Sequence, residues 1–228
     1  MDMCALIMVR GGSKRVPNKN IKMFGHSSLL EIKINQLKQI PELKIYVNSD
    51  SDEILDVAIA CNVNTIKRDP YYATDHVSIN EVYENLAESV KHEHILFAHV
   101  TSPLVQLGSL MGCLETYKNL LAEPIAPHVV QYDSLATVTN IHKFLWHDTE
   151  AVNYDPENMP RSQDLPIYYM LNFAFNILPR KLMIERKNII GKRFYPFALT
   201  ELESYDVDTE EEFTTAQYIY STWNEWFE

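Results

Sequence analysis

Apolar residues recur along this chain at two spacings, and the two spacings alternate. Short apolar runs, typical of buried strands, occupy residues 5–9, 45–47, 63–66 and 94–100. Segments with apolar residues at helical spacing lie between and after them, at residues 30–37, 52–60, 78–90 and 110–121. This alternation predicts an α/β fold with a mainly parallel sheet and helices on both of its faces.

The alternation changes after residue 134. Residues 135–141 and 168–178 predict two further strands, but the segment between them is polar, aromatic and proline-rich and lacks helical periodicity. An irregular excursion of this length in a compact domain is typically functional or an interface. Two capping boxes, Ser78 with Glu81 and Thr209 with Glu212, predict helix starts. No repeat or linker divides the chain, so we expect one domain over residues 1–228.

Polar side chains follow several of the predicted strands. Arg10, Asp50, Arg68 and Thr101 each come just after an apolar run. In parallel α/β sheets, ligands bind beyond the carboxyl ends of the strands. We therefore expect these four side chains to converge on one rim of the sheet.

Composition narrows the kind of ligand. The formal net charge of −11 over 228 residues disfavours nucleic acid and anionic membranes as partners. No apolar run reaches membrane-spanning length, and residues 1–9 are too short for a signal segment. The three cysteines are far apart and form no metal or disulfide spacing, which predicts reduced thiols in a cytoplasmic protein.

The loop after the first strand contrasts with this acidic background. Gly11 and Gly12 permit φ > 0 and close approach of backbone N–H groups to a ligand. Positive charge comes from Arg10, Lys14, Arg15 and Lys19. Such a loop suits an oligophosphate, and the alternative is a solvated strand-to-loop turn.

Two polar segments further along the chain offer complementary chemistry. Asp206 and Asp208 are two residues apart, so in an extended segment they share one face, roughly 6–7 Å apart. Such a pair can hold Mg²⁺, or it can favour the start of the closing helix. Arg161 can bind a carboxylate bidentately, or it can pair with Asp164 at the surface.

Five ordered motifs give the chain a family resemblance. They are Arg10-Gly-Gly-Ser-Lys-Arg-Val-Pro-Asn-Lys-Asn-Ile21, Arg68-Asp-Pro-Tyr-Tyr-Ala-Thr-Asp75 with Ser78, Thr101-Ser102-Pro103-Leu104, Pro160-Arg-Ser-Gln-Asp164 with Asn172-Phe-Ala174, and Glu203-Ser-Tyr-Asp-Val-Asp-Thr209. In this order they resemble the motifs of the acylneuraminate cytidylyltransferases, the CMP-sialic acid synthetases. The Gly-Gly-Ser-Lys-Arg form is closer to enzymes for sialic, pseudaminic or legionaminic acids than to those for the eight-carbon sugar acid of lipopolysaccharide.

The resemblance implies a Rossmann-like three-layer sandwich of the nucleotide-diphospho-sugar transferase type. It also implies that CTP reacts with a 2-keto sugar acid, giving a CMP-sugar and diphosphate with Mg²⁺ as cofactor. These small molecules are the implied partners, together with a second copy of the chain. In the implied homodimer, the excursion at about residues 140–180 crosses toward the partner's site.

The resemblance assigns roles to individual residues as well. The triphosphate is contacted by Arg10, Gly11, Gly12, Ser13 and Lys19. The cytidine is held by Asn20, Arg68 and Ser78, and Mg²⁺ by Asp206 and Asp208. The sugar acid faces His99, Thr101, Ser102, Arg161 and Gln163. The catalytic residues among these are Arg10, Lys19, Arg161 and Asp208.

Two positions depart from the family pattern. His99 stands where the family commonly has a glutamine that contacts the sugar, and Ser162 where many relatives carry a second arginine. The acceptor can therefore differ from an ordinary sialic acid. Two alternatives stay open: a cytidylyltransferase for another acceptor, and a nucleotide-binding protein without turnover.

Overall fold

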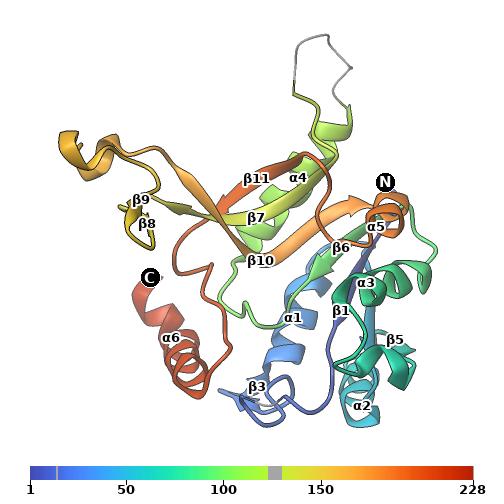
Figure 1. The fold of residues 1–228 in the computed structure, drawn as a ribbon. Coiled ribbons are helices and arrows are strands. Elements are labelled where there is room, and N and C mark those ends of the chain that lie inside the picture. The colour runs from blue at the N-terminus through green and yellow to red at the C-terminus, as the bar shows by residue number, and fades with distance from the viewer. Residues whose placement is uncertain (14, 123–129, 228) are drawn as a thin grey trace.

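A seven-stranded sheet forms the centre of the protein (Figure 1). The computed structural model describes residues 1–13, 15–122 and 130–227. The strands of this sheet are β1 (Met3–Met8), β4 (Lys44–Ser49), β5 (Asn64–Lys67), β6 (His94–Ala98), β7 (Ser134–Ile141), β10 (Tyr168–Pro179) and β11 (Phe194–Leu199). They lie in the order β11-β7-β10-β6-β1-β4-β5.

Strand directions confirm the predicted mainly parallel sheet. The neighbours β6, β1, β4 and β5 run parallel, as do β7 and β11. β10 alone is antiparallel to its two neighbours, β6 and β7. Its pairing with β7 is interrupted by a register shift between Leu171 and Asn176, where Phe173 has a positive φ of 57°.

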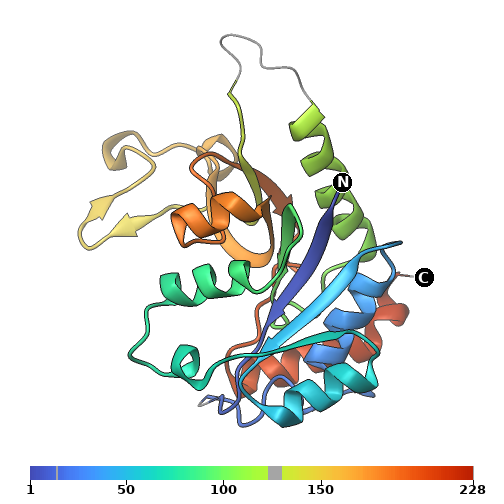
Figure 2. The same cartoon turned by 90° about the vertical axis from the view of Figure 1, so that its right-hand side faces the viewer.

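Helices cover both faces of the sheet, as the hydrophobic pattern predicts (Figure 2). They are α1 (Leu29–Lys38), α2 (Asp52–Ala60), α3 (Ile79–Glu88), α4 (Leu107–Ala122), α5 (Arg180–Arg186) and α6 (Glu210–Phe227). Apolar side chains of α1, α2, α4 and α6 form one buried cluster with the sheet, and those of α3 and α5 form another. The expected three-layer sandwich is therefore confirmed.

Both predicted helix starts are capped in the structure. The Ser78 hydroxyl accepts a hydrogen bond from the Glu81 backbone N–H at 3.3 Å, which starts α3. The Thr209 hydroxyl accepts one from Glu212 N–H at 3.2 Å, and the Glu212 carboxylate accepts one from Thr209 N–H at 2.8 Å. The Thr209 pair thus satisfies a backbone donor on each residue, whereas the Ser78 pair satisfies only the Glu81 N–H, because Glu81 accepts from the Ser78 hydroxyl instead of its backbone N–H.

The segment between β7 and β10 projects from the body of the molecule as an arm (Figure 1). It contains β8 (Trp146–His147), β9 (Glu150–Ala151) and two short 3₁₀ turns, η2 (Pro156–Asn158) and η3 (Ser162–Asp164). Large apolar side chains are more than half exposed on it and on the adjoining start of β10, namely Trp146, Met159, Ile167 and Tyr169.

Three shorter elements lie elsewhere: β2 (Met23–Phe24), β3 (Ser27–Ser28) and η1 (Pro70–Ala73). Among the described residues, no helix is both long and apolar enough to cross a membrane.

Candidate active site

A cleft of about 630 Å³ opens at the carboxyl ends of β1, β5 and β6. Arg10, Arg68 and Thr101 all line it, which confirms that residues following different strands converge on one rim. Asp50 lies at the same rim and accepts a hydrogen bond from Gly11 N–H at 3.1 Å. The cleft is also lined by other residues that the sequence analysis singled out: Ser13, Arg15, Lys19, Asn20, His99 and Asp208.

Two features of the loop after β1 favour glycine. Gly12 has φ +67°, a left-handed conformation that L side chains rarely adopt. A Cβ on Gly11 would come 3.2 Å from the Ser51 Cβ, because the loop passes close to the start of α2. Lys14, in the same loop, lies outside the described residues.

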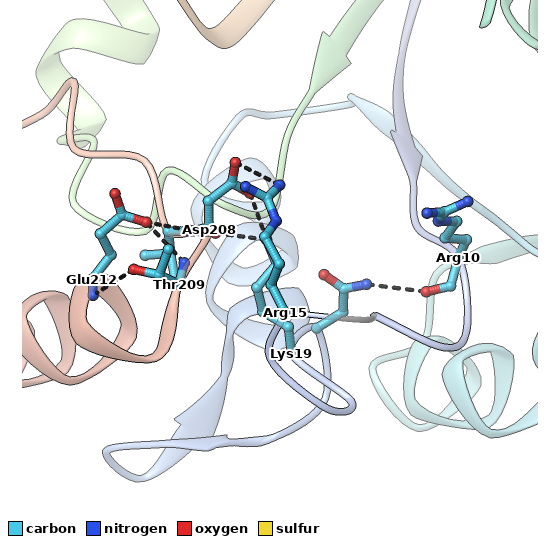
Figure 3. Close-up of polar contacts among 8 residues, drawn as sticks. Arg10, Arg15, Lys19, Asp208, Thr209 and Glu212 are labelled. Atoms are coloured by element: carbon cyan, nitrogen blue, oxygen red, sulfur yellow. Dashed lines mark hydrogen bonds and ion pairs between the residues drawn. The ribbon is translucent and has the colours of Figure 1, made fainter. Parts of the chain in front are cut away.

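The basic loop is joined to the C-terminal acidic segment across nearly the whole sequence (Figure 3). Lys19 Nζ donates to the Val207 carbonyl at 2.6 Å and lies 3.0 Å from Asp208 Oδ1. Arg15 pairs with the other oxygen of Asp208 at 2.8 Å. Cations and a carboxylate therefore face each other at the cleft, with the Lys19 side chain only 11% exposed.

Arg10 stands apart from that cluster (Figure 3). Its guanidinium is half exposed and pairs with Asp75 at 3.2 Å, joining two loops that line the cleft. The Arg10 carbonyl accepts a hydrogen bond from the Asn20 amide at 3.2 Å. The loop thus places Arg10 on one side of the Asn20 amide, and Arg15 and Lys19 together at Asp208.

Asp206 and Asp208 have different environments. Although burial acts to raise it, the pKa of Asp208 is held below its usual value by hydrogen bonds and charges from Lys19 and Arg15. Burial raises the pKa of Asp206, against a hydrogen bond from Thr101, and the negative charge of Asp208 adds to the rise. Asp206 also borders a second cavity of about 530 Å³, between the acidic segment and the end of β7.

This pair fits one kind of metal site. No group of three or more His, Cys, Asp or Glu side chains in the described part of the chain could hold a metal alone. Mg²⁺ commonly takes one or two protein carboxylates and completes its shell with water and substrate phosphates. Asp208 lines the cleft beside the basic loop, whereas Asp206 borders the second cavity and interacts with Asp208 through its charge. As two neighbouring carboxylates they match that donor set, which suits a Mg²⁺ shared with a phosphate ligand.

Arg68 is a buried clamp at the base of the cleft. Its Nε donates to the Asn48 side chain at 2.6 Å, and its Nη2 donates to the Val9 and Asn48 carbonyls, both at 3.0 Å. It is only 4% exposed, and desolvation lowers its pKa. The guanidinium thus fixes the ends of β1 and β4 to each other and still borders the cleft.

Seven of the predicted residues lie outside the set of described residues that line the cleft: Gly11, Gly12, Ser78, Ser102, Arg161, Gln163 and Asp206. Ser78 is the N-cap of α3, where its hydroxyl also donates to Glu81 at 2.9 Å. Arg161 and Gln163 lie on the arm, and Arg161 forms the surface pair with Asp164 at 2.8 Å that the sequence left as one alternative. The described residues of this chain therefore do not bring Arg161 and Gln163 to the cleft.

His99, Thr101 and Ser102 follow β6 directly. His99 and Thr101 line the cleft, whereas Ser102 is buried behind it. His99 Nε2 is buried without a hydrogen-bond partner among the described residues, and its ring contacts Phe97 and Phe173 with centroids 5.0 and 6.0 Å away. Desolvation, followed by the charge of Lys33, lowers its pKa to about 4.

Sequence reasoning missed Lys33, a fully buried lysine of α1 beneath this turn. The signal was available, because Lys33 lies four residues from both Leu29 and Leu37 and so falls on the apolar face of its helix. It also missed Asp75 as the partner of Arg10, since a surface ion pair between two loops leaves no local pattern.

Comparison with known proteins adds independent information. A family model described as cytidylyltransferase matches residues 4–222. The chain is 28% identical over 223 residues to an N-acylneuraminate cytidylyltransferase A of Danio rerio, covering 93% of this chain and 49% of that protein. It is 26% identical over 229 residues to a pseudaminic acid cytidylyltransferase of Campylobacter jejuni, covering 96% and 97% of the two chains.

Solved structures of other proteins share the fold of this chain. A CMP:2-keto-3-deoxy-manno-octonic acid synthetase in complex with CTP matches with a TM-score of 0.68 at 14% identity, covering 97% of this chain and 99% of that one. The chain spans about half the length of some of the curated relatives that it matches, 49% in the case of the Danio rerio protein.

Proposed function

This chain belongs to the cytidylyltransferase family, and we propose that it transfers CMP from CTP to a 2-keto sugar acid of the sialic, pseudaminic or legionaminic acid class. Family membership confirms the resemblance carried by the sequence motifs. One observation supports the proposed reaction most directly: Lys19 and Asp208 form an ion pair in a cleft that is also lined by the glycine-containing basic loop. That combination suits a triphosphate that must be bound and then cleaved.

The basic loop provides for the nucleotide half of the reaction. Arg10, Ser13 and Lys19 line the cleft and are proposed to contact the triphosphate, with the backbone of Gly11 and Gly12 beside it. Asn20, Arg68 and Ser78 are proposed to hold the cytidine. Asn20 and Arg68 are supported because both line the cleft, whereas Ser78 would contribute from the N-cap position of α3.

Asp206 and Asp208 would hold Mg²⁺. When bound, the ion supplies neutralisation of negative charge on the phosphate oxygens. Lys19 orients Asp208 for this role, because it bonds both that carboxylate and the preceding carbonyl of Val207. The acidic segment is held in turn by the Thr101 carbonyl, which accepts from Val207 N–H at 2.9 Å.

The proposed reaction is a displacement at the α-phosphorus. The anomeric hydroxyl oxygen of the sugar acid bonds to this phosphorus, and the bond to the bridging oxygen of the β-phosphate breaks. Diphosphate leaves with that electron pair, and the hydroxyl proton is released. Such transfers depend mainly on positioning and on stabilising charge in the transition state, which the cations of the loop supply.

The binding site for the sugar acid would be formed by residues of two subunits. His99 and Thr101 border the cleft, and Ser102 supports it from behind. Arg161 and Gln163 lie on an arm that carries exposed apolar side chains, a property of surfaces that pack against another protein. We propose a homodimer in which the arm brings Arg161 and Gln163 of the partner subunit to the cleft.

A diphosphate-release assay tests the function. With CTP, Mg²⁺ and a panel of sialic, pseudaminic and legionaminic acids, we expect release with at least one acid and none without an acid. EDTA should stop it, and UTP or ATP in place of CTP serves as the control. If release occurs only with other sugars or sugar phosphates, the acceptor assignment is wrong. Tight CTP binding without turnover on any acceptor would favour a nucleotide-binding protein instead.

Mixing two inactive variants tests the dimer. Asp208→Asn removes the carboxylate of a subunit's own cleft, and Arg161→Ala removes the proposed contribution to the partner's. A mixed dimer holds one intact site, so exchange of equal amounts should restore about a quarter of the wild-type activity. The double variant mixed with Asp208→Asn is the control and should restore none. Absence of recovery despite subunit exchange, seen by native mass spectrometry, would refute the shared site.

A further inference from the structure

Lys33 is a buried ammonium behind the cleft. It lies in the middle of α1 and is 0% exposed. Its Nζ donates one hydrogen bond, to the Ser102 carbonyl at 3.0 Å, and sits 4.6 Å from the centroid of the Phe175 ring. In the described part of the chain, no carboxylate forms an ion pair with it.

Such a group is costly for the fold. A buried charge without a counter-ion loses its hydration, and one carbonyl with an aromatic face replaces that only in part. The pKa of Lys33 is accordingly lowered by desolvation to about 7. An apolar residue of similar volume at this position would avoid the cost of burying a charge. We therefore expect the lysine to serve a role other than stability.

Its hydrogen bond supports the turn that borders the cleft. Gln36, one turn further along α1, donates to the Pro103 and Val105 carbonyls, each at 2.9 Å. Lys33 and Gln36 together bind three carbonyls of the same turn, those of Ser102, Pro103 and Val105. The residue before Ser102 in this turn is Thr101, whose carbonyl anchors the acidic segment through Val207 N–H.

The charge of Lys33 also acts on His99, at the end of β6. Two influences lower the pKa of His99 to about 4: desolvation first, and then the Coulombic effect of Lys33. The imidazole is therefore neutral at physiological pH, when one ring nitrogen is a donor and the other an acceptor. His99 lines the cleft in this state.

We propose that Lys33 is a positioning residue for the acceptor end of the cleft, acting through the Ser102 carbonyl and through His99. This role of Lys33 rests on the proposed function, because it concerns the sugar-acid half of that reaction. Lys33 does not touch the cleft itself. Its hydrogen bond to the Ser102 carbonyl keeps the turn in place, and its charge adds to the burial that leaves His99 uncharged. A neutral His99 then meets a neutral polar group of the acceptor, a hydroxyl or an amide, rather than its carboxylate.

Lys33→Met separates this role from a structural one. Methionine has a similar length and no charge, so it relieves the cost of burying the ammonium but leaves the Ser102 carbonyl without that donor, and thermal stability should change little. The KM for the acceptor should rise about tenfold, while the KM for CTP changes less than about twofold. Lys33→Gln, which can still donate to the Ser102 carbonyl, should recover part of the loss. Lys38→Met removes an exposed lysine from the same helix and is the matched control.

NMR titration of the His99 ring gives a readout that does not need turnover. Removing the nearby positive charge should raise the pKa of His99 above its wild-type value in both Lys33 variants, and not in Lys38→Met. Wild-type kinetics together with an unchanged His99 titration would overturn the inference. So would a fall in stability that raises both KM values equally. A wild-type protein that is inactive on every acceptor would refute the proposed function instead, and the titration would still decide the link between Lys33 and His99.

Discussion

Asp208→Asn is expected to lower kcat/KM for CMP-sugar formation by about 100-fold or more. Asparagine keeps the size of the side chain but removes its negative charge. In the native cleft that charge meets Lys19 at 3.0 Å and Arg15 at 2.8 Å, and the pair with Asp206 provides the proposed Mg²⁺ ligands. The variant therefore loses metal affinity and the orientation of Lys19 together.

Two measurements check this expectation. Steady-state diphosphate release gives the kinetic loss, and electron paramagnetic resonance of bound Mn²⁺ shows whether metal affinity falls with it. Glu210→Gln is the matched control, because Glu210 is an exposed carboxylate two residues away that pairs with Lys22 at 2.7 Å. Its activity should stay near the wild-type value. An Asp208→Asn protein that binds Mn²⁺ and turns over normally would contradict the proposed metal site.

Arg68→Met is expected to destabilise the protein by about 3 kcal/mol and to weaken CTP binding as well. Removing the guanidinium leaves several buried acceptors unpaired, at about 1–3 kcal/mol for each, and the relief of its desolvation cost offsets part of that loss. Arg68 makes three hydrogen bonds, to the Asn48 side chain and to the Val9 and Asn48 carbonyls. The expected change in Tm is a fall of about 6–12 °C.

Thermal and urea unfolding measure the loss of stability, and CTP titration by calorimetry measures the loss of binding. Arg193→Met is the control, since Arg193 is exposed on the loop before β11. Arg68→Lys keeps the charge but lacks the planar fork, so it should fall between the wild type and Arg68→Met. A Tm within about 2 °C of the wild type for Arg68→Met would show that Arg68 is not a clamp.

Local patterns predicted most of the helices and strands because these depend on short-range preferences. The helix at residues 52–60 begins and ends as its apolar spacing indicates. Thr209 makes both contacts of a capping box with Glu212, and Ser78 makes the N-cap contact with the Glu81 N–H. The convergence of residues after β1, β5 and β6 was also predictable, because parallel strands bring their carboxyl ends to the same edge.

Two elements near the C-terminus gave no usable signal. α5 has seven residues, too few for a clear helical period. β11 contains Pro196, which lacks the N–H that an interior strand needs and which argues against a strand in the sequence. The structure tolerates it because β11 is the edge strand of the sheet and pairs only with β7.

The sequence by itself determined the fold class, the family and the chemistry available to the site, because motif composition and periodicity are local properties. Only the tertiary structure decided which groups meet. Lys19 and Asp208 are 189 residues apart, and packing of the acidic segment against the basic loop makes them partners. Lys33 likewise belongs to the apolar face of α1 by its position, but the turn after β6 and Phe175 are what bury its charge next to His99. Contacts between distant segments depend on how the elements pack, and no local pattern encodes that.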